Sequence, residues 1–259
     1  MSQPLVLSLF PGAGLFDMAF EAEGFCVVDA RDRLMGGDHR TFTPPPRRFD
    51  GVIGGPPCKR WSRLAAMVVN NGYELAPDLI PEFCRIVAAA APAWFVMENV
   101  EGAPLPSVDG YVVRDELVRD VWVGGETSRL RRFSFGTRDG LRLRVETLAL
   151  HRPAPEHAVM ASGGGRPVPV ALGGNGKPKR TNPMKNLGYC NSDNLATALR
   201  CAGLPSNYFD EIERDVRHKP WTVAGKQSLI GNGVPLALGR AVAKAVKRAM
   251  YPDLVEAAS

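Results

Sequence analysis

Strand and helix patterns alternate through the first hundred residues, and this alternation restricts the fold more than any other feature of the sequence. Apolar runs of strand length are separated by segments in which apolar residues recur at helical spacing. We expect strands at 5–10, 25–30, 49–55 and 93–99, and helices at 15–24 and 79–92. Such alternation predicts a parallel sheet with right-handed crossover connections. In sheets of this kind, ligands bind beyond the carboxyl ends of the strands.

The predicted strand ends carry residues that suit a nucleoside cofactor. The glycines of "FPGAG" (10–14) would let a ligand approach the amino end of the following helix. The third glycine of the dinucleotide fingerprint is missing, which argues against a nicotinamide oxidoreductase. Asp29, or alternatively Asp32, could hold ribose hydroxyls, and Asp38 could accept a hydrogen bond from an adenine amino group. We therefore expect a cofactor with an adenosine group and no diphosphate.

Two further strand ends carry a thiol and a carboxylate. "GGPPC" (54–58) places Cys58 on a stiff turn, where it is either a nucleophile or a surface thiol. The nucleophile would be the thiolate, and Lys59, Arg60 or an approaching arginine would raise its fraction. Glu98 closes the strand at 93–99, where burial would favour a protonated acid that can donate in catalysis; a capping role is the alternative.

The segment "TSRLRRFSFG" (127–136) reads as a strand rich in arginine. Alternation along a strand would place Arg129 and Arg131 on one side, with Leu130 and Arg132 on the other. Two neighbouring guanidinium groups suit phosphate, carboxylate or base-edge oxygens. A solvated strand surface is the alternative.

Charge and composition change in the second half of the chain. Residues 127–190 carry twelve lysines and arginines against three acidic residues, in a chain whose net charge is +5. This excess favours a polyanionic partner, most simply nucleic acid, over a merely solubilising surface. Residues 151–190 hold thirteen glycines or prolines, which predicts loops, short strands or disorder. Helices are expected again at 194–205 and 235–250.

The remaining composition points to a reducing, aqueous environment. The five cysteines are widely spaced and form no C-x-x-C pair, which argues against a zinc site or a disulfide scaffold. The sequence contains no apolar run of membrane-spanning length and no secretory pattern. We therefore expect a cytoplasmic protein without a metal or membrane partner.

Taken in order, the motifs resemble those of the DNA cytosine-5 methyltransferases, particularly compact bacterial and phage forms. "FPGAG" and "GGPPC" are followed by "ENV" (98–100), "SRLRR" and "GNGVP" (231–235). The resemblance implies an α/β, doubly wound Rossmann-like fold that uses S-adenosylmethionine, with a small, loop-rich target-recognition domain. It implies a catalytic domain at 1–145 plus 215–259 and a recognition domain at 146–214.

The resemblance also implies a role for each matched residue. Cys58 would add to C6 of a flipped-out cytosine, Glu98 would contact N3 and the amine, and Arg131, assisted by Arg129, would hold O2. The methyl group of S-adenosylmethionine would then pass to C5, leaving S-adenosylhomocysteine. The implied cofactor contacts are Phe10, Gly12, Gly14, Asp29, Asp38, Asn232 and Val234. The candidate DNA contacts are Lys59, Arg60, Arg166, Lys177, Lys179 and Arg180, with Asn182 also available for base reading.

The expected partner is double-stranded DNA, bound by a monomer in a bacterial or phage-infected cell, in a restriction-modification setting. Two alternatives keep the fold and change the function. One is an RNA (transfer-RNA) cytosine-5 methyltransferase, and the other is a non-catalytic DNA-binding relative. Retention of Cys58, Glu98 and Arg131 together argues against the second, because a binding protein has no physical need of all three.

Overall fold

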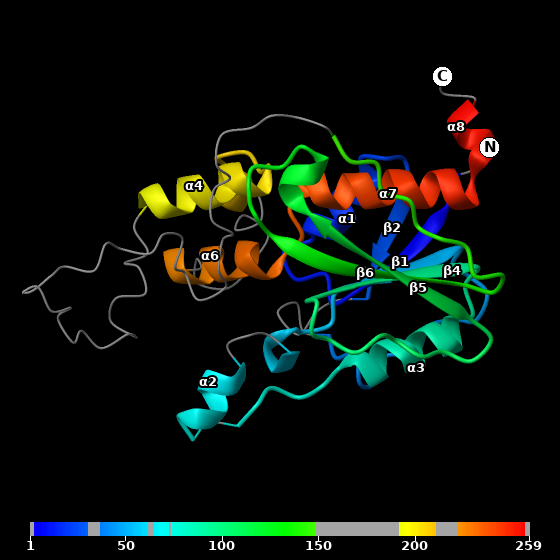
Figure 1. Cartoon of the computed structure of the whole chain (residues 1–259), viewed down its shortest axis with the longest axis horizontal. Helices are drawn as coiled ribbons and strands as arrows, with labels where there is room; N and C mark the ends of the chain where they lie inside the picture. Colours follow the sequence, from blue (N-terminus) through cyan, green and yellow to red (C-terminus); the bar gives the residue numbers. More distant parts are fainter. Residues whose placement is uncertain are drawn as a thin grey trace, which may run out of the picture.

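The computed structural model describes residues 3–30, 37–61, 65–72, 74–148, 192–210 and 222–256 (Figure 1). Its centre is a six-stranded sheet with the strand order β2-β1-β3-β4-β6-β5. The strands are β1 (Leu5–Leu9), β2 (Cys26–Asp29), β3 (Gly51–Gly54), β4 (Trp94–Asn99), β5 (Val112–Arg119) and β6 (Leu130–Thr137). The first four pair in parallel, as the alternating pattern predicted.

The prediction of a parallel sheet came from the first hundred residues, and two later strands, β5 and β6, extend the sheet at its far side. Strand β6 pairs antiparallel with both β4 and β5, so it runs against the other strands. The sheet is therefore mixed, with a hairpin-like pair of long strands added to a parallel half. The short, irregular connection from β5 to β6 permits this direction, whereas a parallel pair would need a longer crossover.

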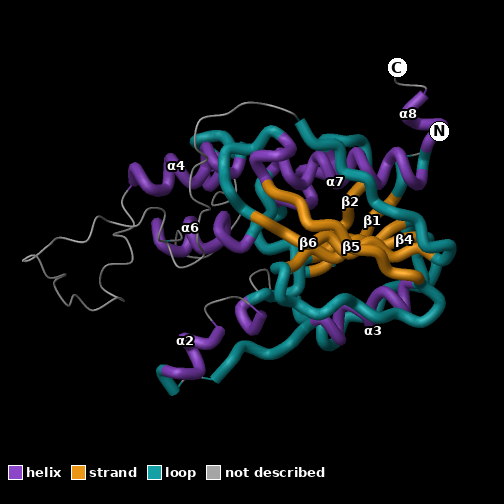
Figure 2. Tube along the Cα trace, in the orientation of Figure 1, coloured by secondary structure: helices purple, strands orange, loops and turns teal. Residues whose placement is uncertain are grey.

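Helices cover both faces of the sheet (Figure 2). Helices α1 (Leu15–Glu21) and α7 (Leu236–Met250) pack together on one face, and α3 (Ile80–Ala90) covers the other (Figure 1). The remaining described helices are α2 (Ala65–Asn70), α4 (Ser192–Ala202), α6 (Val223–Asn232), α8 (Pro252–Glu256) and the 3-10 turns η2 (Lys59–Trp61) and η3 (Asp120–Val123). The arrangement confirms the predicted α/β, doubly wound fold.

Two hydrophobic cores follow from the alternation of side chains along the strands. On β4, Trp94 and Val96 point into the core beneath α1 and α7, while Phe95 and Met97 point into the core beneath α3. All six residues of β4 are buried, because the strand lies between these two cores in the middle of the sheet. Burial of both faces explains why this strand reads as a continuous apolar run until Glu98.

Strand β3 begins and ends with glycine because its neighbours lie very close. A Cβ atom on Gly54 would lie 2.7 Å from the carbonyl oxygen of Leu9 and 3.0 Å from the ring of Phe83. A Cβ atom on Gly51 would overlap the indole of Trp94. The glycine before the cysteine turn is thus required by sheet packing, and it brings the carboxyl ends of β1 and β3 together.

Helix α4 and the residues after it pack on the body of the protein. Leu199 and Tyr208 share a hydrophobic cluster with Leu15 of α1 and Ile230 of α6. The Tyr208 hydroxyl donates a hydrogen bond to the carbonyl oxygen of Ala13. These contacts fall within the range 146–214 assigned to the recognition domain, and the division into two domains stays a prediction.

Within the described ranges, no helix combines the length and the apolar character needed to cross a lipid bilayer. The same ranges contain no cluster of three or more histidine, cysteine, aspartate or glutamate side chains suited to a metal ion.

Candidate active site

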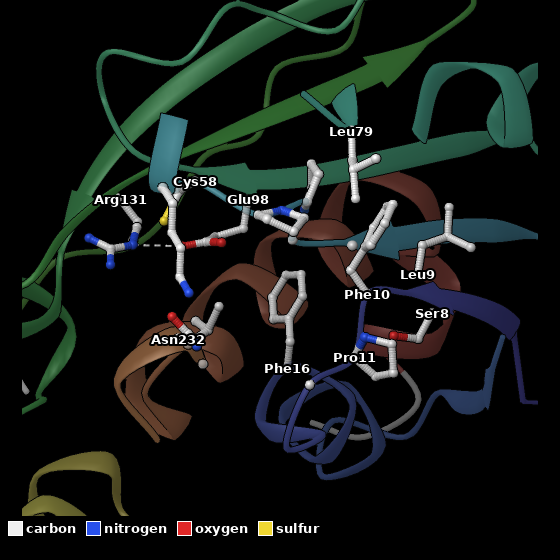
Figure 3. Close-up of a pocket in the computed structure, with 18 of the residues that line it drawn as sticks. Ser8, Leu9, Phe10, Pro11, Phe16, Cys58, Leu79, Glu98, Arg131 and Asn232 are labelled. Atoms are coloured by element: carbon white, nitrogen blue, oxygen red, sulfur yellow. Dashed lines mark ion pairs between the residues drawn. The ribbon is translucent and has the colours of Figure 1, made fainter. Parts of the chain in front are cut away.

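A cavity of about 340 Å³ opens at the carboxyl ends of the parallel strands, where the sequence placed the chemistry (Figure 3). Its walls come from the turn between β1 and α1, the ends of β3 and β4, the start of β6, and the turn after α6. Cys58, Glu98, Arg129 and Arg131 all line it. The four residues predicted to act in catalysis are therefore brought together from three separate parts of the chain.

The cysteine turn is held by the asparagine of "ENV". The Asn99 side-chain amide donates a hydrogen bond to the carbonyl oxygen of Pro56 at 3.1 Å, and its Oδ1 atom accepts from Val100 N at 2.8 Å. After the turn, Trp61 N donates to the carbonyl oxygen of Cys58 at 2.9 Å. Asn99 thus acts as the clamp between the two strand ends, while its neighbour Glu98 lines the cavity.

Glu98 forms an ion pair with Arg131 inside the cavity. The Arg131 Nε atom lies 2.7 Å from Glu98 Oε1, and the side chains of both residues are largely buried (Figure 3). A second Arg131 nitrogen donates to the carbonyl oxygen of Leu130 at 2.7 Å, which fixes the direction of the guanidinium group. A Cβ atom on Gly55 would lie 3.0 Å from Glu98 Oε2, so glycine at this position leaves room for the carboxylate.

The groups around the Cys58 thiol shift its pKa in opposite directions. Burial raises the pKa of Cys58, and the carboxylate of the ion pair raises it further, whereas Arg131 and Arg129 lower it. The two guanidinium groups that lower the pKa come from Arg131 on β6 and from Arg129 just before it, which fits the predicted approach of an arginine to the thiol. A negatively charged sulfur in this cavity depends on those two guanidinium groups.

Arg129 lies just before β6 and is almost fully buried. Burial, followed by the neighbouring Arg131, lowers its pKa to about 9. The turn that carries it is held by buried Asp120, whose carboxylate accepts hydrogen bonds from Thr127 N at 2.9 Å and Thr127 Oγ1 at 2.7 Å. Arg132 points away and donates to the carbonyl oxygen of Ala103, so the alternation predicted along this strand is present.

The turn after β1 shapes another wall of the cavity. Phe10 adopts a left-handed backbone conformation (φ 55°), and its ring stacks on His39 with 4.1 Å between ring centroids. The Phe10 amide donates to His39 Nε2 at 3.0 Å, and this bond holds the imidazole against the Phe10 ring at the cavity wall. Gly12 also has a positive φ of 57° and lines the cavity.

The other predicted cofactor residues divide into two groups. Asn232 lines the cavity from the end of α6 (Figure 3), and Val234 lines it from the turn that follows. Asp38 lines a smaller adjoining cavity of about 100 Å³ together with Phe10. The Asp38 carboxylate is held by Arg40 at 2.6 Å. Gly14, which precedes α1 with a φ of 72°, and Asp29, which is exposed at the end of β2, are not among the residues lining either cavity.

The predicted DNA contacts are only partly described. Lys59 is exposed at the edge of the cavity, and Arg60 donates to the carbonyl oxygen of Ala76 at 3.5 Å. The alternative ribose ligand Asp32 lies outside the described residues. The remaining predicted DNA contacts also lie outside them, namely Arg166, Lys177, Lys179, Arg180 and Asn182.

The sequence reasoning missed a polar pair in the cavity wall. Ser8 Oγ donates a hydrogen bond of 2.5 Å to Asp17 Oδ1, and both residues line the cavity. Burial raises the pKa of Asp17 to about 7. Two features of the sequence could have indicated this pair. Ser8 is a polar residue inside an apolar strand, and Asp17 lies in the first turn of the next helix, so both positions lie near the same strand end.

Solved structures with the same fold were found by comparison. The S. pombe Dnmt2 methyltransferase aligns with a TM-score of 0.56 and 10% identity over 96% of this chain and 100% of that one. Entamoeba histolytica methyltransferase EhMeth aligns with a TM-score of 0.54 and 11% identity over 98% of this chain and 99% of that one. The fold is therefore that of the methyltransferases.

Sequence comparison gives the family. Residues 33–107 match the family described as C-5 cytosine-specific DNA methylase. The Type II methyltransferase M.HgiGI of Herpetosiphon aurantiacus is 31% identical over 122 residues, covering 39% of this chain and 94% of that protein. The Type II methyltransferase M.NgoPII of Neisseria gonorrhoeae is 33% identical over 116 residues, covering 38% of this chain and 33% of that protein. The chain belongs to the C-5 cytosine-specific DNA methylase family, and it spans about a third of the length of relatives such as M.NgoPII.

Proposed function

We propose that this protein transfers a methyl group from S-adenosylmethionine to C5 of cytosine in duplex DNA. The observation that carries the proposal is the placement of Cys58 in one cavity with the Glu98–Arg131 ion pair. A thiol supplies a nucleophile, and the ion pair supplies a fixed polar edge that a pyrimidine ring can bind. Membership of the cytosine methylase family supports cytosine as the base.

The residues of the cavity fit the proposed cofactor. A volume of about 340 Å³ lies in the range typical of small-molecule sites. Phe10 offers an aromatic surface, Gly12 leaves the backbone of the first turn accessible, and Asp38 offers an acceptor in the adjoining cavity. Asn232 and Val234 would bound the cofactor on the side of α6. When bound, S-adenosylmethionine would supply an electrophilic methyl group to this cavity.

Cys58 and Glu98 would act on opposite parts of the base. The Cys58 thiolate would form a bond to C6 while the C5–C6 electron pair moves onto C5, and Glu98 would hydrogen-bond N3 and the exocyclic amine to stabilise the ring as it accepts the sulfur. Arg131, already fixed by the Leu130 carbonyl oxygen, would hold Glu98 in place and reach the O2 atom. Covalent addition replaces one difficult step by two easier ones.

Release of the product would reverse the addition. After C5 has gained the methyl group, loss of its proton to a base returns an electron pair to the ring. That pair restores the C5–C6 bond and expels the Cys58 thiolate. The thiolate leaves into a site where Arg129 and Arg131 favour its negative charge.

The cavity also requires that the base leave the helix. Cys58 and Glu98 would contact the ring from different sides within a walled cavity, and a stacked base does not offer both contacts. Extrusion of the base costs about a few kcal/mol. Residues 146–214 would supply the target recognition, with Arg166, Lys177, Lys179 and Arg180 as candidate contacts.

The proposal is tested by methyl transfer to duplex DNA that contains every dinucleotide context. Labelled S-adenosylmethionine should transfer its methyl group to C5 of cytosine, and bisulfite sequencing should report the context. Cys58→Ser and Glu98→Gln should each lower the rate by at least a thousandfold, whereas Cys84→Ser, a half-buried cysteine of α3, should not change it. A stable complex between wild-type protein and DNA that contains 5-fluorocytosine should form through Cys58.

Two results would count against the proposal. Transfer to transfer RNA with none to DNA would select the RNA cytosine-5 methyltransferase. Binding to DNA without methyl transfer or covalent trapping would select the non-catalytic relative.

A further inference from the structure

Asp17 occupies a position in the cavity that the proposed chemistry does not use. It lies in the first turn of α1, lines the same cavity as Cys58, and accepts a short hydrogen bond from Ser8 at the end of β1. In Figure 3, Ser8 lies across the cavity from Cys58 and Arg131. Through its hydrogen bond to Ser8, Asp17 belongs to the wall of the cavity opposite Cys58 and Arg131.

The groups around Asp17 do not favour a negative charge there. Burial is the largest influence and raises the pKa of Asp17 to about 7, and the nearby carboxylates of Asp29 on β2 and Glu21 on α1 raise it further. The Ser8 hydroxyl lowers the pKa of Asp17. The hydroxyl of Tyr208 donates to the carbonyl oxygen of Ala13, and its pKa is raised by burial and then by the nearby charge of Asp17. A partly buried carboxylate in such surroundings is stabilised when a cation enters beside it.

We propose that Asp17 binds the α-ammonium group of S-adenosylmethionine, as a cofactor-binding residue of this site. This assignment rests on the proposed function. S-adenosylmethionine carries two positive centres, and the sulfonium must lie next to Cys58 and Glu98 because it bears the transferred methyl group. The amino-acid end then extends toward another wall, and Asp17 on the Ser8 side of the cavity supplies the complementary charge.

The proposal makes affinity depend on pH in a defined direction. Binding of an ammonium group selects the ionised form of Asp17, whose fraction rises from about one tenth at pH 6 to about one half at pH 7 when its pKa is about 7. The affinity of the wild-type protein should therefore rise about fivefold over this interval. The α-amino group stays protonated in this range, since such groups titrate at about 7.7–8.0.

The test is calorimetric binding of S-adenosylhomocysteine, which keeps the ammonium group and lacks the methyl group, so that no turnover occurs. Asp17→Asn should weaken binding at pH 7.5 by at least tenfold and remove the rise in affinity between pH 6 and 7. The control Glu21→Gln alters an exposed carboxylate on the same helix and should leave affinity within twofold. A second probe, 5′-methylthioadenosine, lacks the amino-acid portion and should bind wild-type and Asp17→Asn equally.

The outcomes separate this inference from the function on which it rests. Wild-type protein that binds neither nucleoside would overturn the proposed function and the inference together. If wild-type protein binds S-adenosylhomocysteine and Asp17→Asn binds it equally well, only the assignment of Asp17 is overturned. Equal weakening of both probes would also overturn it, by placing Asp17 against the nucleoside. The pH dependence of the wild-type protein tests the same point without any variant.

Discussion

Replacing Asp17 with asparagine should stabilise the ligand-free protein, by an amount that grows with pH. Burial raises the pKa of this carboxyl group from its ordinary 3.8 to about 7. Between these values the folded protein retains a proton that the unfolded chain has released. The contribution of this retained proton to the stability of the folded wild-type protein is therefore fully present below pH 3.8 and is lost as the pH rises through 7. Asparagine keeps an acceptor for Ser8 and exchanges no proton.

The magnitude follows from the width of the pH window. One proton of difference contributes about 1.4 kcal/mol for each pH unit over which it persists. Between pH 5 and 8 the free energy of unfolding of the wild-type protein should fall, relative to Asp17→Asn, by about 2 to 3 kcal/mol. Any change in packing caused by the substitution is the same at every pH and cancels in this comparison.

Urea denaturation followed by circular dichroism at pH 5, 6, 7 and 8 measures this difference. The comparison requires that the free energy of unfolding fall with urea concentration at a similar slope in the two proteins at each pH, since a changed slope would indicate a changed denatured state. Glu21→Gln, which alters an exposed carboxylate, serves as the control. A difference between wild-type and Asp17→Asn that stays constant within about 0.5 kcal/mol across the range would refute the argument from burial.

Three further predictions concern packing, the turn after β1, and the thiol. Gly54→Ala should lower the free energy of unfolding by about 1–3 kcal/mol, because its Cβ would lie 2.7 Å from the Leu9 carbonyl oxygen; an unchanged melting temperature would contradict this. Tyr208→Phe removes the hydrogen bond to Ala13 and should cost about 1 kcal/mol in urea denaturation, and no loss would mean that water replaces the contact. Alkylation of Cys58, followed by mass spectrometry of its peptide, should have its midpoint at a higher pH in the folded protein than in the urea-unfolded protein, since burial raises the pKa of the thiol. A lower midpoint in the folded protein would show that the arginines outweigh burial.

Much of the parallel half of the fold was predictable because each strand there is buried on both faces. The expected strands at 5–10, 25–30, 49–55 and 93–99 agree with the structure to within one or two residues at each end. The convergence of Cys58 and Glu98 also followed from sequence, since the carboxyl ends of parallel strands meet at one edge of the sheet.

Other features depend on contacts between distant residues, which local patterns do not report. The direction of β6 depends on its pairing with β4 and β5. The clamp from Asn99 to Pro56 joins residues 43 positions apart, and the contact from Tyr208 to Ala13 joins residues 195 apart. Asp17 was overlooked for a related reason, because an acidic residue in the first turn of a helix is common and only its burial in the cavity makes it unusual.

The two ends of the described chain are interlocked at the cavity. The end of α6 contributes Asn232 and the turn after it contributes Val234. Helix α7 then packs so tightly on α1 that a Cβ atom on Gly239 would lie 2.6 Å from that of Ala19. A ribosome releases the β1 turn long before it releases this last segment. A nascent chain would therefore carry its cysteine turn exposed and without a closed cavity until α6, α7 and the turn between them have been synthesised.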